Sequence, residues 1–122
     1  RRPPAWTTLE GVDVAATIAA GGAPLLVDDL ATWLTGVLDD AGAWDAHPVP
    51  PVVQERVGEL VAAVANAPGR VVLVSAEVGL GVVPPTRAGR LFRDELGALN
   101  TALAAVADEV VLLVAGLPLK LK

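Results

Sequence analysis

The stretch Arg70-Val-Val-Leu-Val-Ser-Ala-Glu-Val-Gly-Leu-Gly-Val-Val-Pro84 carries the most information about the fold. It begins with an apolar run that predicts a buried strand over residues 70–76, and it leads into an amphipathic segment that predicts a helix over 86–107. A carboxylate and two glycines where a strand gives way to a helix are typical of the ligand-binding edge of an open α/β sheet. We therefore expect a binding loop that starts at Glu77.

Short apolar runs and amphipathic segments alternate along the rest of the chain. The predicted strands cover residues 24–28, 70–76 and 109–114, and the predicted helices cover residues 9–20, 30–38, 51–66 and 86–107. Val- and Leu-rich strands separated by helices indicate an α/β fold with a mostly parallel sheet that helices flank and bury on both faces. Gly116-Leu-Pro118 breaks the chain before the last residues. So few strands make a small sheet with an uncovered edge, and a missing N-terminal strand would explain this.

Composition narrows the possible functions. With 122 residues, 53% of them hydrophobic, the chain is expected to form one domain, or part of one, with a sizeable core. Its net charge of −5, without a basic patch, argues against nucleic-acid binding. No apolar run approaches the ~18 residues of a membrane span, and no secretory signal is present. These features, together with the absence of cysteine, favour a cytoplasmic protein.

Asp28 is the first candidate site residue. It ends the predicted strand 24–28, where an acid can hold Mg²⁺ directly or through water, as in Walker B sites. Three apolar residues followed by Asp is a common pattern, however. Asp28 or its neighbour Asp29 can equally cap the helix that begins near residue 30, and with two adjacent acids one residue can serve each role.

The loop after the central strand supplies the next candidates. Glu77 can accept hydrogen bonds from a base, a sugar or a hydroxyl group. Gly79 and Gly81 can let the backbone approach a ligand closely or adopt positive φ. The alternative is a turn in which the glycines serve only the backbone and Glu77 is solvated. Gly-Leu-Gly is not the Gly-x-Gly-x-x-Gly fingerprint, so a dinucleotide site is not indicated.

Polar residues on the helix 86–107 form the last group. Arg90, Arg93 and Asp94 combine guanidinium forks that can bind phosphate with a carboxylate, although such a face is often only solvated surface, which we favour for Arg87. Arg93 and Asn100 share one flank of the helix, which favours an internal or ligand-facing role for both. His47, the one histidine, is interpreted as a surface residue.

Together these segments resemble the bifunctional adenosylcobinamide kinase/adenosylcobinamide-phosphate guanylyltransferase family of cobalamin biosynthesis. Their order and spacing make the match specific. Residues 25–28 resemble the family's Walker B strand, and residues 2–10 resemble the segment that follows its guanylylated histidine. The other matching segments are Glu77–Pro84, Arg90–Asp94, Gly97, Asn100, Ala107–Val110 and Ala115–Pro118.

The resemblance implies a P-loop, RecA-like fold, commonly in a trimer. It implies phosphorylation of adenosylcobinamide by ATP or GTP, followed by transfer of GMP from GTP through a phosphoramidate on histidine to give adenosylcobinamide-GDP. Asp28 would be the Walker B acid for Mg²⁺, and Glu77, with Gly79 and Gly81, would belong to the nucleotide or substrate pocket. The wall of that pocket would be supported by Arg93, Asp94 and Asn100.

The chain also departs from the family pattern. The family's phosphate loop, its lysine and its nucleophilic histidine should all precede Arg1, and the only lysines here are Lys120 and Lys122. These 122 residues alone are therefore expected to be inactive. Four further positions differ: Asp29 replaces a usual cysteine, Gly36 and Ala76 replace asparagines, and Thr101 replaces a glutamine. The alternative is a non-catalytic descendant that acts as a nucleotide-binding or assembly module.

Overall fold

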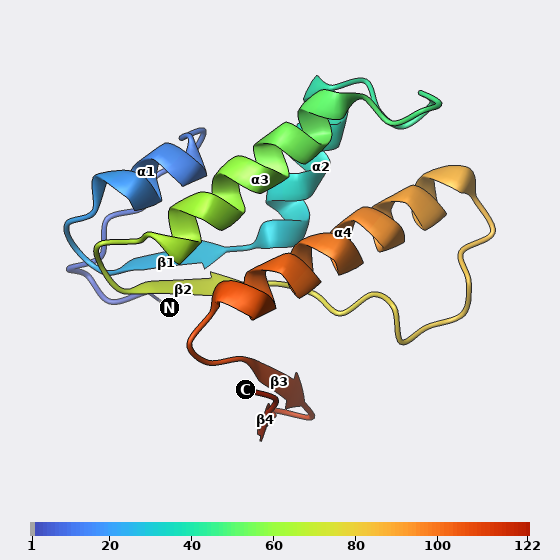
Figure 1. Ribbon diagram of the computed structural model, residues 1–122. Helices are drawn as coiled ribbons and strands as arrows, with labels where there is room; N and C mark the ends of the chain where they lie inside the picture. Colours follow the sequence, from blue (N-terminus) through green and yellow to red (C-terminus); the bar gives the residue numbers. More distant parts are fainter. Residues whose placement is uncertain (1) are drawn as a thin grey trace.

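The computed structural model describes residues 2–122 as a mixed α/β fold (Figure 1). Four helices accompany a small parallel sheet, and an antiparallel hairpin follows the last helix. The elements in chain order are α1 (Val14–Ala20), β1 (Leu25–Asp28), α2 (Leu30–Asp40), α3 (Pro51–Ala65), β2 (Val71–Val74), α4 (Arg87–Val106), β3 (Val111–Val114) and β4 (Leu117–Lys120). None of these helices is long and apolar enough to cross a membrane.

Local side-chain chemistry sets where α1 and α4 begin. The Asp13 carboxylate accepts a hydrogen bond from the Ala16 N–H, and Thr86 Oγ1 accepts one from the Gly89 N–H. Such N-caps satisfy backbone donors that the first helical turn leaves unpaired. The helix predicted over 9–20 therefore starts only at Val14, after its cap. The prediction over 86–107 is confirmed to within one residue at each end.

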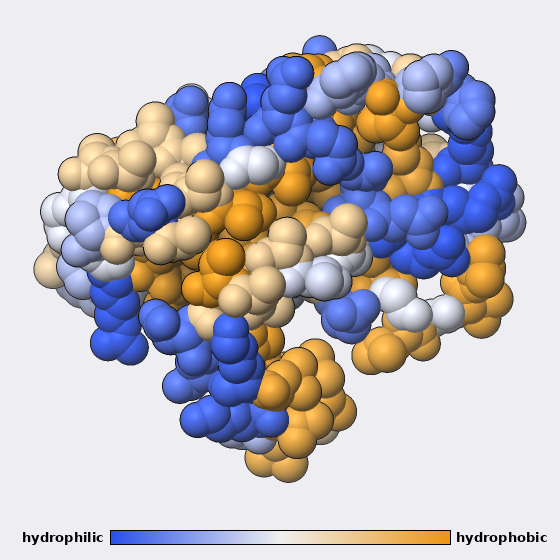
Figure 2. Space-filling view, viewed as in Figure 1, coloured by the Kyte–Doolittle hydropathy of each residue, from blue (hydrophilic) through white to orange (hydrophobic). Residues whose placement is uncertain are grey.

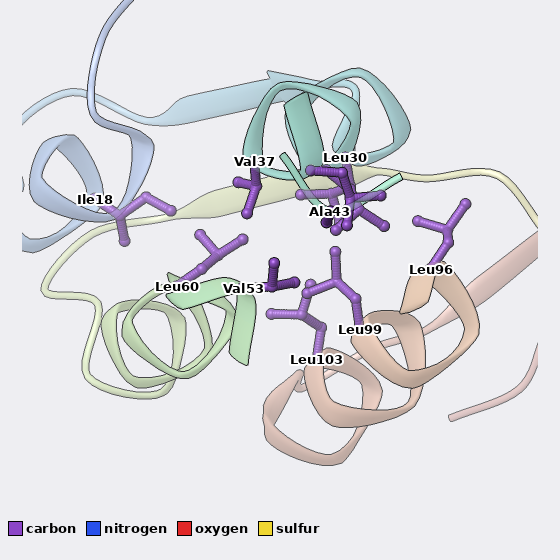
Figure 3. Packing of buried hydrophobic residues seen from close by; sticks show 11 residues of the cluster. Ile18, Leu30, Val37, Ala43, Val53, Leu60, Leu96, Leu99 and Leu103 are labelled. Carbon is purple, nitrogen blue, oxygen red and sulfur yellow. The ribbon is translucent and has the colours of Figure 1, made fainter. Parts of the chain in front are cut away.

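The core lies between the helices (Figure 3). Helix α3 contacts α1 on one side and α4 on the other, and α2 contacts both α3 and α4. The amphipathic pattern predicted for α4 is confirmed, because one face of the helix buries three leucines, Leu96, Leu99 and Leu103. The buried apolar residues are Ile18, Leu30, Leu34, Val37, Leu38, Ala43, Val53, Leu60, Leu96, Leu99 and Leu103.

Strands β1 and β2 pair in parallel, with Leu25 opposite Val71 and Asp28 opposite Val74. Burial alternates along both strands, so that one face packs on the helices and the other is exposed. Leu26 and Val72, each 46% exposed, lie on this bare face. The prediction that the sheet is buried on both faces is therefore wrong for residues 2–122, where helices cover one face only.

The predicted strand 109–114 forms, but its pairing differs from the prediction. Instead of extending the parallel sheet, β3 pairs antiparallel with β4, a strand that the sequence did not predict. The break at Gly116 is the two-residue turn of this hairpin, because Ala115 and Gly116 have positive φ angles of 52° and 74°. Apolar side chains gather on the hairpin surface (Figure 2), where Leu113 and Leu117 are 68% and 70% exposed.

Candidate functional site

The carboxyl ends of β1 and β2 meet at one edge of the sheet. Since the strands are parallel and Asp28 lies opposite Val74, the residues that follow β2 leave the sheet on the same side as Asp28. This is the edge at which open α/β sheets bind ligands. The geometry therefore places Asp28 at the same edge of the sheet as the segment Ser75–Glu77.

The sequence left open which of the two adjacent acids, Asp28 or Asp29, caps the helix that follows. Asp29 caps α2, since its Oδ1 accepts a 2.8 Å hydrogen bond from the Thr32 N–H. Asp28 is exposed, and its side chain takes part in none of the hydrogen bonds or ion pairs seen among residues 2–122. The capping interpretation thus belongs to Asp29, and the Asp28 carboxylate is left available to a ligand.

The acidic residues at this edge suit only one mode of Mg²⁺ binding. No group of three His, Cys, Asp or Glu side chains converges anywhere in residues 2–122, so the described chain holds no all-protein metal cage. Mg²⁺ commonly keeps several waters and binds through one or two carboxylates together with substrate phosphates. A lone exposed carboxylate at the edge, that of Asp28, suits that mode of binding.

Asn100 fastens the start of the loop to α4. Its Nδ2 donates to the Ala76 carbonyl at 2.9 Å, and its Oδ1 accepts from Ser75 Oγ at 2.6 Å. One side chain thereby fixes two successive residues just after β2. Asn100 was predicted as a site residue, whereas Ser75 was missed, although a polar residue directly after an apolar strand was a usable signal.

The middle of the loop is exposed and bonded only to itself. The Gly79 N–H donates to Glu77 Oε1 at 3.0 Å, which closes a tight turn. A Cβ atom on Gly79 would lie 3.1 Å from the same oxygen, whereas a Cβ atom on Gly81 would meet no atom within 4 Å. Neither Gly79 nor Gly81 has a positive φ angle, so the prediction that these glycines allow positive φ is wrong. Close approach of a ligand remains the functional prediction for both.

The end of the loop is also fastened to α4. Arg90 Nη1 donates to the carbonyls of Pro84 and Pro85, each at 3.0 Å. Asn100 and Arg90 therefore hold the two ends of the loop on one helix, with the exposed segment that begins at Glu77 between them. Arg90 was predicted only as a possible phosphate fork, and its contacts with the two prolines were missed.

Arg93 and Asp94 are not brought to the sheet edge by any contact in residues 2–122. They form an ion pair with each other, with Arg93 Nη2 2.8 Å from Asp94 Oδ1, and Asp94 is 64% exposed. The prediction that Arg87 is only a solvated surface residue is wrong. Its guanidinium donates hydrogen bonds to the carbonyls of Trp44 and Ala46 in the loop before α3. His47 in that loop is exposed, which confirms the surface interpretation.

A groove lies beside the edge, between β2 and the hairpin, where Figure 2 shows the molecule hollowed. It comprises two hollows, of about 850 and 660 Å³, that share Val72, Leu73, Val111 and Leu112 in their walls. Glu77 lines both hollows and Asn100 lines the larger one. The predicted residues Glu77 and Asn100 thus line one common hollow.

Comparison with known proteins identifies similar chains. The family description "Cobinamide kinase / cobinamide phosphate guanyltransferase" matches residues 1–121. The bifunctional adenosylcobalamin biosynthesis protein CobP of Pseudomonas aeruginosa is 44% identical over 128 residues, which span 100% of this chain and 69% of that protein. The bifunctional adenosylcobalamin biosynthesis protein CobU of Salmonella typhimurium is 36% identical over 132 residues, which span 99% of this chain and 72% of that protein.

A third relative, CobU of Escherichia coli, is 38% identical over 104 residues. These residues span 80% of this chain and 58% of that protein. Each of the three relatives thus contains a substantial segment that has no counterpart in residues 1–122.

Proposed function

Because the chain belongs to the cobinamide kinase / cobinamide phosphate guanyltransferase family, we propose that it forms one wall of that enzyme's nucleotide and cobinamide site. The proposed enzyme phosphorylates adenosylcobinamide with ATP or GTP and then transfers GMP from GTP to give adenosylcobinamide-GDP. One observation carries the proposal: the family match extends over residues 1–121 and so includes the sheet edge at which Asp28 and Glu77 follow paired strands.

The residues of this edge take separate roles in the proposal. Asp28 holds Mg²⁺, directly or through water, and the bound ion neutralises charge on the nucleotide phosphates. Glu77 accepts a hydrogen bond from a base, sugar or hydroxyl of a substrate, which its exposed carboxylate can do without losing a buried partner. Gly79 and Gly81 leave room for that substrate beside the loop backbone.

Helix α4 positions this wall. Asn100 fixes the backbone on which Glu77 stands, through its hydrogen bonds to Ser75 and Ala76. Arg93 and Asp94, which form an ion pair with each other on α4, support the same wall in the proposal. Phosphoryl transfer depends mainly on such positioning and on charge stabilisation, which a rigid support favours.

The other wall is proposed to come from outside residues 1–122. A Gly-x-x-x-x-Gly-Lys-Ser/Thr loop needs a glycine directly before its lysine, whereas Lys120 and Lys122 both follow a leucine. The phosphate loop and the guanylylated histidine would then lie in the part of the enzyme that the relatives have in addition. We propose a P-loop fold and a trimer for the complete enzyme, in keeping with the family resemblance.

The four positions that depart from the family pattern are compatible with this proposal. Asp29 caps α2, and Thr101 Oγ1 donates to the Gly97 carbonyl within α4. At Ala76 it is the backbone carbonyl, not the side chain, that bonds to Asn100. Gly36 is exposed on α2. Each departure is thus compatible with the local structure and leaves Asp28 and Glu77 unobstructed.

The test is calorimetric titration of GTP, with and without Mg²⁺, into the complete polypeptide that contains residues 1–122. We expect magnesium-dependent binding that weakens by about tenfold or more in Asp28→Ala, since a carboxylate that holds the ion contributes a charge-assisted contact. The matched control is Glu59→Ala, which removes an equal charge from the exposed side of α3.

A second measurement separates the enzyme from a binding module. Incubation of the complete polypeptide with radiolabelled GTP should yield an acid-labile phosphoramidate, whereas the 122-residue chain alone should yield none. GTP binding that ignores Mg²⁺ and Asp28→Ala, together with no labelled protein, would favour the non-catalytic module instead.

A further inference from the structure

The two most exposed large apolar side chains among residues 2–122 lie in the loop that links β2 to α4. Val82 is 95% exposed and Leu80 is 80% exposed, and the neighbouring Val83 is 63% exposed. Figure 2 shows orange atoms along this loop, which Figure 1 draws in yellow. One exposed valine or leucine is ordinary, but three within four residues form an apolar patch of the kind that marks an interaction site. We call residues Leu80–Val83 the apolar segment.

Hydrogen bonds on both sides of the apolar segment hold the loop in place. Before the segment, Asn100 Nδ2 donates to the Ala76 carbonyl. After the segment, Arg90 Nη1 donates to the Pro84 carbonyl. Both donors belong to α4, so the two ends of the loop are fixed to one helix. A surface that is fixed before binding loses less conformational entropy when a ligand arrives.

The loop carries no charge between Glu77 and Arg87, because every residue from Val78 to Thr86 is uncharged. The nearest cations are already engaged, since the guanidinium groups of Arg87 and Arg90 donate to backbone carbonyls. Phosphate groups in proteins are bound mainly by cationic side chains and aligned backbone N–H groups. The apolar segment therefore does not match the phosphates of a nucleotide.

The apolar segment is continuous with the candidate site. Leu80 follows Glu77 by three residues, and both line the same hollow beside the sheet edge. The turn between them is closed by the hydrogen bond from the Gly79 N–H to Glu77 Oε1. A ligand that reaches the Glu77 carboxylate therefore has an apolar surface next to its polar contact.

We propose that Leu80, Val82 and Val83 contact the corrin ring of the cobinamide substrate. This inference rests on the proposed function, which brings two unlike substrates to one edge. The nucleotide is a polyanion, whereas a corrin ring is a large macrocycle whose rim carries methyl groups and uncharged amides. An uncharged, aliphatic surface complements the macrocycle and not the nucleotide. Water leaves both apolar surfaces on contact, which favours binding.

A second copy of the chain is a poorer occupant of this surface. A stable protein–protein interface buries about 800 Å² on each partner and involves about 20–30 residues a side. The apolar segment has four residues and is bounded by polar or charged ones at Glu77 and Thr86. It is therefore too small to hold two copies together by itself, whereas three aliphatic side chains suit one edge of a macrocycle.

The test is calorimetric titration of adenosylcobinamide, and separately of GTP, into the complete polypeptide that contains residues 1–122. The double variant Leu80→Ser, Val82→Ser should raise the Kd for adenosylcobinamide by about tenfold or more, because two apolar contacts are lost. Its Kd for GTP should stay within about twofold of the parent's. The matched control, Leu80→Met with Val82→Ile, keeps both positions apolar and should bind adenosylcobinamide within about threefold of the parent.

A second measurement detects the contact directly. In NMR spectra of the methyl-labelled complete polypeptide, adenosylcobinamide should shift the methyl resonances of Leu80, Val82 and Val83, because the macrocycle lies against them. GTP should shift them much less. In turnover, the serine variant should raise KM for adenosylcobinamide and leave kcat nearly unchanged, as expected for contacts made equally in the ground and transition states.

The outcomes separate this inference from the function on which it rests. If the parent binds both substrates and the serine variant binds adenosylcobinamide as tightly, the inference is overturned and the proposed function stands. If the parent does not bind adenosylcobinamide, both are overturned. Sedimentation velocity covers the remaining occupant: a serine variant that dissociates into smaller species, with unchanged methyl shifts on ligand addition, would assign the apolar segment to a second copy and overturn the inference.

Discussion

The helix-covered side of this molecule and its strand edges differ in a way that the sequence does not suggest. The strands are the most apolar runs in the chain, yet none of the eleven buried apolar residues found among residues 2–122 belongs to a strand. All but Ala43 come from helices. On the other side, Val72, Leu113 and Leu117 are between 46% and 70% exposed.

The difference shows that the two regions depend on different partners. Each helix carries one apolar face, and within residues 2–122 the other helices and one face of the sheet are enough to cover it. A strand of Val and Leu has two apolar faces and two hydrogen-bonding edges, so it needs neighbours on several sides. The helical core is therefore complete in this chain, while the sheet has unsatisfied surface.

The largest expected effect tests this contrast directly. Leu99→Ala in the helical core should lower the free energy of unfolding by about 2–5 kcal/mol, because it removes a fully buried side chain and leaves a cavity. Leu113→Ala on the hairpin makes the same chemical change at an exposed site and should cost less than about 0.5 kcal/mol. Urea titrations followed by circular dichroism measure both. Equal losses of unfolding free energy in the two variants would contradict the difference between the helical core and the hairpin.

A smaller effect is expected where the two regions are joined. Asn100→Ala removes the hydrogen bonds to Ser75 and to the Ala76 carbonyl, each worth about 0.5–1.5 kcal/mol. The start of the loop should loosen, with faster amide exchange from Ser75 to Gly79 and little change within α4. Thr101→Ala, one residue further along α4, is the matched control, since its hydroxyl bonds only within the helix. Faster exchange in that control would mean that α4, not Asn100, orders the loop.

The smallest effect separates the two acids at the end of β1. Asp29→Ala should destabilise the chain by about 1 kcal/mol, because α2 loses its N-cap. Asp28→Ala should change thermal stability little, since no bond among residues 2–122 depends on that side chain. Thermal unfolding of both variants decides between them. A larger loss of thermal stability for Asp28→Ala than for Asp29→Ala would assign Asp28 a structural role and argue against it as a ligand of Mg²⁺.

Much of the candidate site could be predicted because its residues lie in short sequence patterns that can be recognised without the structure. Asp28 and Glu77 each follow a Val- or Leu-rich run, and Gly79 follows Glu77 at a spacing that allows a tight turn. The bonds of Asn100 to Ala76 and of Arg87 to Trp44 join residues 24 and 43 positions apart. No local pattern contains such pairs, so Ser75 was missed as a partner of Asn100 and the contacts of Arg87 were missed as well.

The sequence by itself determined that four helices form and which apolar face α4 buries. These features rest on contacts three or four residues apart, which the spacing of side chains already specifies. Only the tertiary structure decided which of two adjacent acids remains available, and that β3 closes on β4 instead of joining the sheet. A two-residue turn makes hairpin closure local, whereas pairing of β3 with β2 would have to span the loop after β2 and the whole of α4.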